Sequence, residues 1–210
     1  MPYPGTLSET LADAGLHVVG VSAAVLASGA LMMHVVQAHG LAEITATGIY
    51  TGCLILSLLA SMAYHLLPWE GSRPLFHRLD HAAIYLKIAG TYTPLVVLIG
   101  SAFAYVVLAG VWAVALIGAV AKMSFWATDA RGSLALYLAM GWAAVVLIWP
   151  MWQALPGATV GLIALGGALY TTGTVVFARD ALRFQNAIWH GFVLSASACF
   201  FAAVAVAVSV

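Results

Sequence analysis

The chain has 210 residues, of which 64% are hydrophobic and only 7% are charged, and its formal net charge is zero. Charged residues make up about a quarter of an ordinary soluble protein. This composition therefore excludes a soluble globular domain, which could not hide so much apolar surface from water. Because the net charge is zero and the charges are sparse, nothing in the composition indicates a nucleic-acid partner, and we expect none. We expect an integral membrane protein whose partner is membrane lipid; the sequence indicates no oligomeric state.

Seven apolar segments are long enough to cross a bilayer, which takes roughly 20 helical residues. They lie at about 17–38, 45–68, 79–100, 102–121, 133–150, 158–178 and 187–209. A tight turn at Gly100 and Ser101 separates the third segment from the fourth, and Pro150 bounds the fifth, which is the shortest. The apolar runs are continuous, whereas the strands of a β-barrel alternate. We predict an all-α, seven-transmembrane helical bundle, with residues 1–210 forming a single integral membrane domain.

The basic residues indicate the orientation of the bundle. Six of the seven lie in or beside the loops after spans two, four and six: Arg73, Arg78, Lys122, Arg131, Arg179 and Arg183. The loops after spans one, three and five contain no Lys or Arg. Since cytoplasmic loops are enriched in these residues, we predict a cytoplasmic N-terminus and an external C-terminus. The seventh, Lys87, lies inside the third span and is expected to face the bundle interior near Asp80, because an ammonium facing lipid is costly.

Polar residues gather at the predicted cytoplasmic ends of four spans. They are Glu9, Asp13 and His17 before or at the start of the first span, Ser61 and His65 at the end of the second, Asp80 at the start of the third, and Asn186 and His190 at the start of the seventh. Residues four apart share a helical face. Imidazoles from two helices and an oxygen donor can hold a divalent ion and leave one position open. A nearby carboxylate can then act as a general base. The shared depth favours a metal site.

Each of these residues also has a simpler interpretation when it is considered alone. A single His at a span end is more often an interfacial hydrogen-bonding group, and His34, His39, His77 and His81 are read in that way. Asp80 alone could pair with Arg78 or with Lys87. Glycines in the sixth span predict close contact between helices: Gly161, Gly166, Gly167 and Gly173.

Several motifs, in order, resemble the hemolysin III family, the bacterial branch of the progestin and adipoQ receptor (adiponectin-receptor-like) proteins. The longest are Arg78-Leu-Asp80-His-Ala-Ala-Ile-Tyr85 and Ile88-Ala-Gly-Thr-Tyr-Thr-Pro94. The others are Glu9-x3-Asp13-x3-His17, Ser61-x3-His65, Met140-Gly-Trp142, Gly166-Gly-x2-Tyr170 and Asn186-Ala-Ile-Trp-His190 with Phe192-Val193. The resemblance runs from about residue 9 to the C-terminus. It implies a multi-pass protein of the bacterial inner membrane with a cytoplasmic N-terminus.

The resemblance also implies a zinc site near the inner leaflet. In the family pattern the His of the second span and a His-x3-His pair on the seventh are ligands, which transfers ligand roles to His65 and His190. The Asp that opens the third span positions a water for the metal, which makes Asp80 and its neighbour Ser61 the candidate catalytic residues.

The chain departs from this pattern at two positions. The first His of the seventh-span pair is Asn186, a weaker zinc ligand, and the usual Asn of the first motif is Asp13. Four alternatives stay open: a weakly bound zinc ion, a different ion, recruitment of Asp13 or His17 as an accessory ligand, or no metal. The paired exchange fits a rearranged site, and we hypothesise that Asn186→His raises zinc affinity.

Three functions follow from different classes of protein. The first is a metal-dependent hydrolase of lipid amides or esters, because related receptor and ceramidase-like proteins share the Ser, His, Asp and paired-His arrangement. The second is a pore-forming, cytolytic protein, although no amphipathic segment or polar channel face is evident. The third is a non-catalytic protein of membrane homeostasis or a receptor-like protein with a structural or vestigial metal site, which the Asn186 exchange favours.

Overall fold

The computed structural model describes residues 6–125, 131–179 and 182–210 and is all-helical over these ranges. Its elements are α1 (Leu7–Ala38), α2 (Leu41–Leu66), a 3-10 turn (Glu70–Ser72), α3 (Arg73–Ile99), α4 (Ala102–Ser124), α5 (Arg131–Trp142), a second 3-10 segment (Ala143–Leu147), α6 (Ile148–Ala154), α7 (Gly157–Phe177) and α8 (Gln185–Ala207). Seven helical segments of the described chain are long and apolar enough to cross a membrane. The predicted fold class and number of spans are confirmed.

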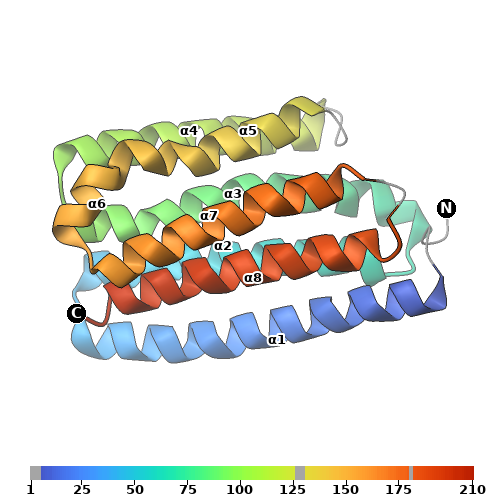
Figure 1. Ribbon diagram of the computed structural model, residues 1–210, viewed down its shortest axis with the longest axis horizontal. Coiled ribbons are helices and arrows are strands. Elements are labelled where there is room, and N and C mark those ends of the chain that lie inside the picture. The colour runs from blue at the N-terminus through green and yellow to red at the C-terminus, as the bar shows by residue number, and fades with distance from the viewer. Residues whose placement is uncertain (1–5, 126–130, 180–181) are drawn as a thin grey trace.

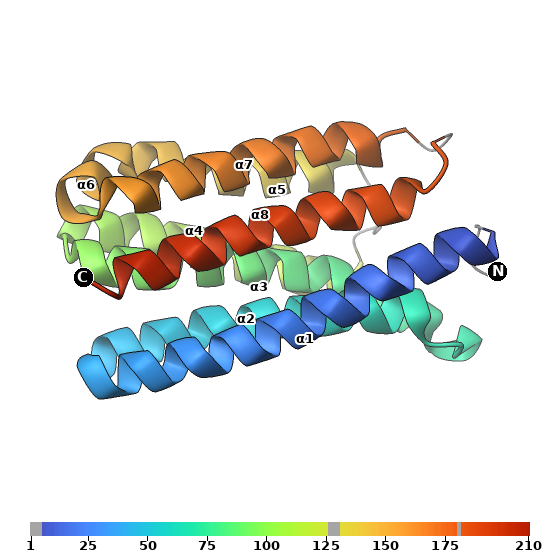
Figure 2. The same cartoon turned by 60° about the horizontal axis from the view of Figure 1, so that its bottom comes forward.

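The seven spans run side by side along the long axis of the bundle (Figure 1). Helix α8 lies between α1 and α7 in both views (Figures 1 and 2), so the last span packs against the first. The spans alternate in direction, so α1, α3, α5 and α8 all begin at one end of the bundle. We call this the amino end. Residues that are far apart in sequence, near the starts of α1, α3 and α8 and the end of α2, therefore meet there.

The first span begins ten residues earlier than the apolar pattern indicates, at Leu7 rather than near residue 17. A capping interaction explains the extra turns, since the Glu9 carboxylate accepts a hydrogen bond from the backbone N–H of Thr6 at 2.6 Å. Such an interaction satisfies a backbone donor that the first turn of a helix leaves free. As a result, Asp13 and His17 lie within a regular helix.

The fifth span does not end at Pro150, contrary to the prediction. Helix α5 ends at Trp142, a 3-10 segment follows, and α6 continues through Pro150 to Ala154. Proline has no backbone N–H and cannot bond to the carbonyl four residues before it, here that of Val146. The helical hydrogen-bond pattern is interrupted beside that position, and the span continues after it.

The predicted turn between the third and fourth spans is confirmed. Gly100 has a left-handed backbone with φ of 67°, which glycine adopts without the steric cost of a Cβ atom. Ser101 then caps α4, because its hydroxyl accepts a hydrogen bond from the backbone N–H of Ala104 at 3.2 Å.

Large apolar side chains cover the outside of the bundle, including Leu26, Ile117 and Trp149, which are 75%, 70% and 66% exposed. Water would disfavour such a surface, whereas a lipid environment suits it. The interior contains tightly buried residues such as Tyr50 and Tyr85. The apolar exterior is the expected surface of a multi-pass membrane protein.

Candidate metal centre

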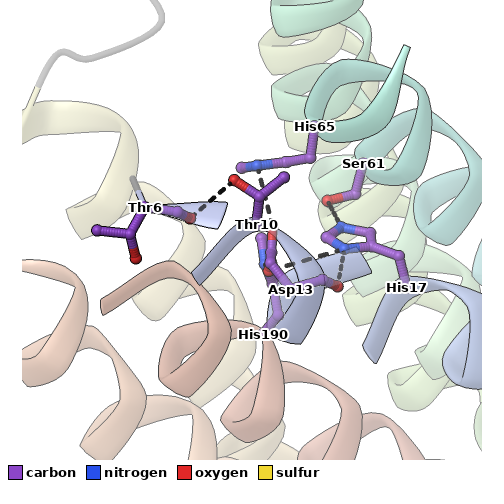
Figure 3. Close-up of polar contacts among 7 residues, drawn as sticks. All are labelled: Thr6, Thr10, Asp13, His17, Ser61, His65 and His190. Atoms are coloured by element: carbon purple, nitrogen blue, oxygen red, sulfur yellow. Dashed lines mark hydrogen bonds and ion pairs between the residues drawn. The ribbon is translucent and has the colours of Figure 1, made fainter. Parts of the chain in front are cut away.

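A cluster of polar side chains lies near the amino end of the bundle, and Figure 3 shows its members from α1, α2 and α8. Helix α1 contributes Asp13 and His17, α2 contributes Ser61 and His65 from its last turns, α3 contributes Asp80 from its second turn, and α8 contributes His190. The sequence predicted that these stretches share one depth in the membrane. The described contacts among them agree with that expectation.

Close packing of α1 on α8 brings the two ends of the chain together. A Cβ atom placed on Gly20 would lie 2.5 Å from the Leu194 side chain of α8, so no larger residue fits there without a shift. Gly20 lies seven residues after Asp13, and Leu194 lies four residues after His190. Both spacings keep the residues on one helical face. The glycine contact therefore supports the approach of Asp13 to His190.

The Asp13 carboxylate lies at the centre of the cluster and is fully buried. Its Oδ1 atom accepts a hydrogen bond from Nδ1 of His190 at 2.5 Å. Its Oδ2 atom is 3.5 Å from Nδ1 of His65. His17 lies beside both partners, with ring centroids 4.4 Å from His190 and 5.3 Å from His65. One buried carboxylate thus faces three imidazoles from three helices.

A chain of hydrogen bonds leads from this carboxylate's helix to α3. Nδ1 of His17 donates to the backbone carbonyl of Asp13 at 2.9 Å, and Nε2 of the same ring is 3.3 Å from the Ser61 hydroxyl. The Ser61 hydroxyl also hydrogen-bonds the Asp80 carboxyl. Because Nδ1 faces a carbonyl, it carries a proton, and Nε2 is the atom whose protonation can vary. Ser61 therefore connects an imidazole to a carboxyl group.

The donor set of Asp13, His65 and His190 fits a divalent metal ion. One ligand atom from each lies within 4.8 Å of the others, and bonds of about 2.0–2.2 Å to zinc place neighbouring ligands roughly 3.4 Å apart. Small side-chain rotations close that difference. Two imidazole nitrogens and one carboxylate oxygen are typical of zinc sites that keep a fourth position open. An ion also offsets the cost of a buried carboxylate at membrane depth.

Two further sequence-derived candidates lie on the same helices as this donor set. Asn186 of α8 lines the cavity one turn nearer the amino end than His190 and is partly buried. Glu9 lies one turn before Asp13, in the first turn of α1. Its carboxylate accepts hydrogen bonds from the backbone N–H groups of Thr6 and Phe184. Phe184 precedes α8 and has a left-handed backbone with φ of 58°. Glu9 thus links the starts of α1 and α8.

The central position of Asp13 is the main feature that sequence reasoning underestimated. The sequence placed it among accessory residues, since its motif carries Asn in the family pattern. Its spacing of four from His17 was the available signal, but spacing alone does not say which neighbour the carboxylate faces. The rotation of α1 against α2 and α8 decides that, and it depends on side-chain packing along the whole helix.

Two histidines that the sequence suggested were interfacial hydrogen-bonding groups line the cavity. His77 and His81 lie on α3, with ring centroids 4.7 Å apart, and Tyr64 stacks on His77 at 4.5 Å. The guanidinium of Arg73 lies over the Tyr64 ring, 5.5 Å from its centroid. This aromatic group forms the part of the cavity wall nearest the amino end.

The candidate site opens into a cavity of about 980 Å³ inside the bundle. Every span except α4 contributes to its lining. His17, Ser61, His65, Asp80 and His190 line it near the amino end. Farther along, the wall is largely apolar and includes Leu95, Leu147, Ile148, Met151 and Val160. The cavity therefore combines a polar end with a long apolar portion, the arrangement that an amphiphile requires.

The Lys87 prediction is confirmed. The side chain is 7% exposed, and its ammonium donates to the Tyr170 hydroxyl inside the cavity. It is also close enough to Asp80 for the two charges to interact. Arg78, the other suggested partner of Asp80, instead donates to the backbone carbonyl of Lys122 at 2.8 Å.

Comparison with known proteins gives a consistent result over nearly the whole chain. The sequence pattern of the family described as "Haemolysin-III related" matches residues 7–201. "Hemolysin-3" of Bacillus cereus is 36% identical over 199 residues, which cover 93% of this chain and 90% of that protein. The "Hemolysin-3 homolog" of Bacillus subtilis (strain 168) is 34% identical, with coverage of 93% and 92%. The human "Monocyte to macrophage differentiation factor" is 28% identical, with coverage of 96% and 85%.

Proposed function

Because the chain belongs to the haemolysin-III related family and is a multi-pass bacterial membrane protein, we propose that it is a zinc-dependent hydrolase of lipid amides or esters. The observation that carries this proposal is the fully buried Asp13 carboxylate between His65 and His190. Zinc accepts this mixture of imidazole nitrogen and carboxylate oxygen and keeps a position for substrate or water.

The residues around the donor set have complementary roles in this proposal. Zinc supplies Lewis acidity, which polarises a carbonyl group and makes water a better nucleophile. Asp80 takes a proton from the attacking water, and Ser61 orients the Asp80 carboxyl through its hydrogen bond. The scissile C–N or C–O bond then breaks, and the products are a carboxylic acid and an amine or alcohol. The leaving group receives the proton that Asp80 accepted.

The shape and polarity of the cavity support the proposal that the substrate is a lipid. Its apolar portion can hold acyl chains, while the reacting carbonyl lies beside the polar cluster. A membrane lipid can supply both parts if the amino end faces the inner leaflet, as the distribution of Lys and Arg predicts. A substrate that fills the cavity would displace water from it, which would limit the reaction to the bound acyl group.

The test measures metal content and lipid hydrolysis with the same samples. We expect protein purified in mild detergent to retain zinc, and His65→Ala to lose it. Incubation with N-acyl and O-acyl lipids should release a carboxylic acid, detected by mass spectrometry, and a chelator should stop the release. Asp80→Asn should keep zinc but lower the rate by roughly 10²–10⁴-fold, the usual contribution of a general base.

Two results would contradict the proposal in different ways. A zinc-loaded protein that releases no acid from any acyl lipid would favour a non-catalytic protein with a structural metal. Release of trapped dye from lipid vesicles by the purified protein, unchanged in His65→Ala, would favour the cytolytic activity that the names of the Bacillus relatives suggest.

A further inference from the structure

Lys87 is a charged side chain deep in the cavity that the hydrolytic site does not use. It lies on α3 seven residues after Asp80, which corresponds to roughly 10 Å along a helix. Its side chain is 7% exposed and lines the cavity. Nζ donates a hydrogen bond to the Tyr170 hydroxyl of α7 at 2.5 Å, and that hydroxyl is 3.3 Å from the Ser197 hydroxyl of α8. Three helices thus meet at one ammonium group.

The ammonium has unused hydrogen-bonding capacity. A Lys side chain carries three N–H donors, and Tyr170 takes one of them. Within residues 6–125, 131–179 and 182–210, no carboxylate lies within 4 Å of Nζ. Asp80 interacts with the charge only at longer range. Two N–H groups, together with the one hydroxyl proton that the Tyr170–Ser197 pair does not use between its own members, are therefore available to an acceptor in the cavity.

The charges and the shape of the cavity specify the acceptor. An ammonium at membrane depth is unfavourable unless it is hydrated or paired, so an anionic partner is favoured there. The wall beyond Lys87 is apolar and includes Leu95, Met151 and Val160. From Lys87 to the end of α3 at Ile99 the helix extends roughly 18 Å, which leaves room for a long alkyl chain. A ligand that satisfies both features has one anionic group and one acyl chain.

We propose that Lys87, Tyr170 and Ser197 form an anion-binding subsite, which holds the carboxylate of a long-chain acid whose chain occupies the apolar portion of the cavity. Lys87 supplies the charge and two N–H donors, and the hydroxyl pair of Tyr170 and Ser197 supplies one further O–H donor. The subsite lies about two turns from Asp80 and includes none of the metal-ligating residues. Ligand binding there does not require the metal ion.

The test compares two probes that differ only in the head group, palmitate and hexadecanol, on chelator-treated full-length protein in a neutral detergent. Wild type should bind palmitate more tightly than hexadecanol. Lys87→Met keeps the length of the side chain but removes its charge and donors. It should weaken palmitate binding roughly 10- to 100-fold, the value of a charge-assisted hydrogen bond, and change hexadecanol binding less than about twofold. Tyr170→Phe should show the same selectivity with a smaller effect.

A matched control separates the head-group contact from the chain contact. Leu95→Ala alters the apolar wall two turns beyond Lys87, and it should weaken the binding of both probes to a similar extent. Retained hexadecanol binding by Lys87→Met shows that the variant is folded. Zinc content is measured in each variant before chelator treatment, and a content that matches wild type shows that the variant is folded and keeps the donor set. Palmitate affinity unchanged in both Lys87→Met and Tyr170→Phe, or equal loss of both probes in a Lys87→Met protein of wild-type zinc content, would overturn the subsite. Failure of the subsite is thus distinguishable from failure of the proposed metal site.

Discussion

Asp13 and Asn186 occupy the two positions at which this chain differs from the hemolysin III pattern, and the structure relates the two exchanges. The chain has an acid on α1 where the family resemblance implies Asn, and an amide on α8 where it implies His. The Asp13 carboxylate faces His65 and His190, and Asn186 lines the cavity one turn before His190. If Asp13 is a ligand, a carboxylate on one helix replaces the imidazole that the resemblance implies on another. Ligand number would be preserved although the ligand changes helix.

If Asp13 replaces residue 186 as a ligand, zinc affinity should differ in a defined way among four proteins: wild type, Asp13→Asn, Asn186→His and the double variant. Asp13→Asn should weaken zinc binding by at least roughly 100-fold, because even the loss of a side chain that only supports a ligand costs 10–100-fold. Asn186→His should strengthen it, and adding that change to Asp13→Asn should recover most of the lost affinity. Chelator-competition titration measures each value.

The four affinities also identify the ways in which the prediction can fail. If Asp13→Asn binds zinc as tightly as wild type, Asp13 is not a ligand and its contact with His190 is structural. If Asn186→His has no effect in either background, residue 186 does not reach the metal. Glu9→Gln is the control on the same helix. Its zinc affinity should equal that of wild type, because the Glu9 carboxylate accepts hydrogen bonds from the backbone at the starts of α1 and α8.

The packing of α7 against α8 determines where Tyr170 and Ser197 meet. Two glycines of α7 face aromatic side chains of α8: a Cβ atom on Gly173 would lie 2.8 Å from Cβ of Phe192, and one on Gly166 would lie 3.0 Å from the Phe200 ring. Gly161 and Gly167 have no such neighbour within 4 Å. The expectation of close contact is therefore confirmed for two of the four glycines and wrong for the other two. Gly166 and Gly173 are seven residues apart and share a face, whereas Gly167 is rotated toward the cavity.

We expect Gly173→Ala to lower the free energy of unfolding by about 1–3 kcal/mol, because the added methyl group forces α7 and α8 apart. Gly161→Ala on the same helix is the control. It should be neutral or stabilising by up to about 1 kcal/mol, since alanine favours the helix and meets no neighbour. Unfolding in mixed micelles measures both values. Equal stabilities of the two variants would mean that α7 and α8 do not pack through these glycines.

At the scale of the whole molecule, an odd number of spans places the start of α1 and the end of α8 at opposite ends of the bundle (Figure 1). The candidate metal site and the basic residues of the described loops both lie at the amino end. The positive-inside pattern predicts that this end faces the cytoplasm. The candidate chemistry would then take place at the inner leaflet.

Reporter fusions test the orientation directly. A reporter that is active only in the cytoplasm should work when it is attached to the N-terminus and fail at the C-terminus, and a reporter that is active only outside should behave oppositely. A C-terminal fusion with cytoplasmic activity would reverse the topology. It would also move the proposed site to the outer leaflet, where the lipids available as substrates differ.

The sequence by itself determined the number of spans and the polar residues from which a site at the amino end can be built. Continuous apolar runs must become helices in lipid, because only a helix satisfies the backbone hydrogen bonds of a single segment there. Spacings of four placed Ser61 with His65 and Asn186 with His190 on common faces. The motif order also identified the family before any contact was known.

Only the tertiary structure decided which of these residues meet. The sequence could not choose Asp13 over Asn186, because each helix can rotate and shift along its neighbours without changing its own periodicity. Close packing, such as that of Gly20 against Leu194, sets the rotation and places Asp13 beside His190. The same packing brings Lys87 to Tyr170, 83 residues away in sequence. Side-chain volumes at helix contacts, summed over all the spans, decide these positions, and local patterns do not contain that information.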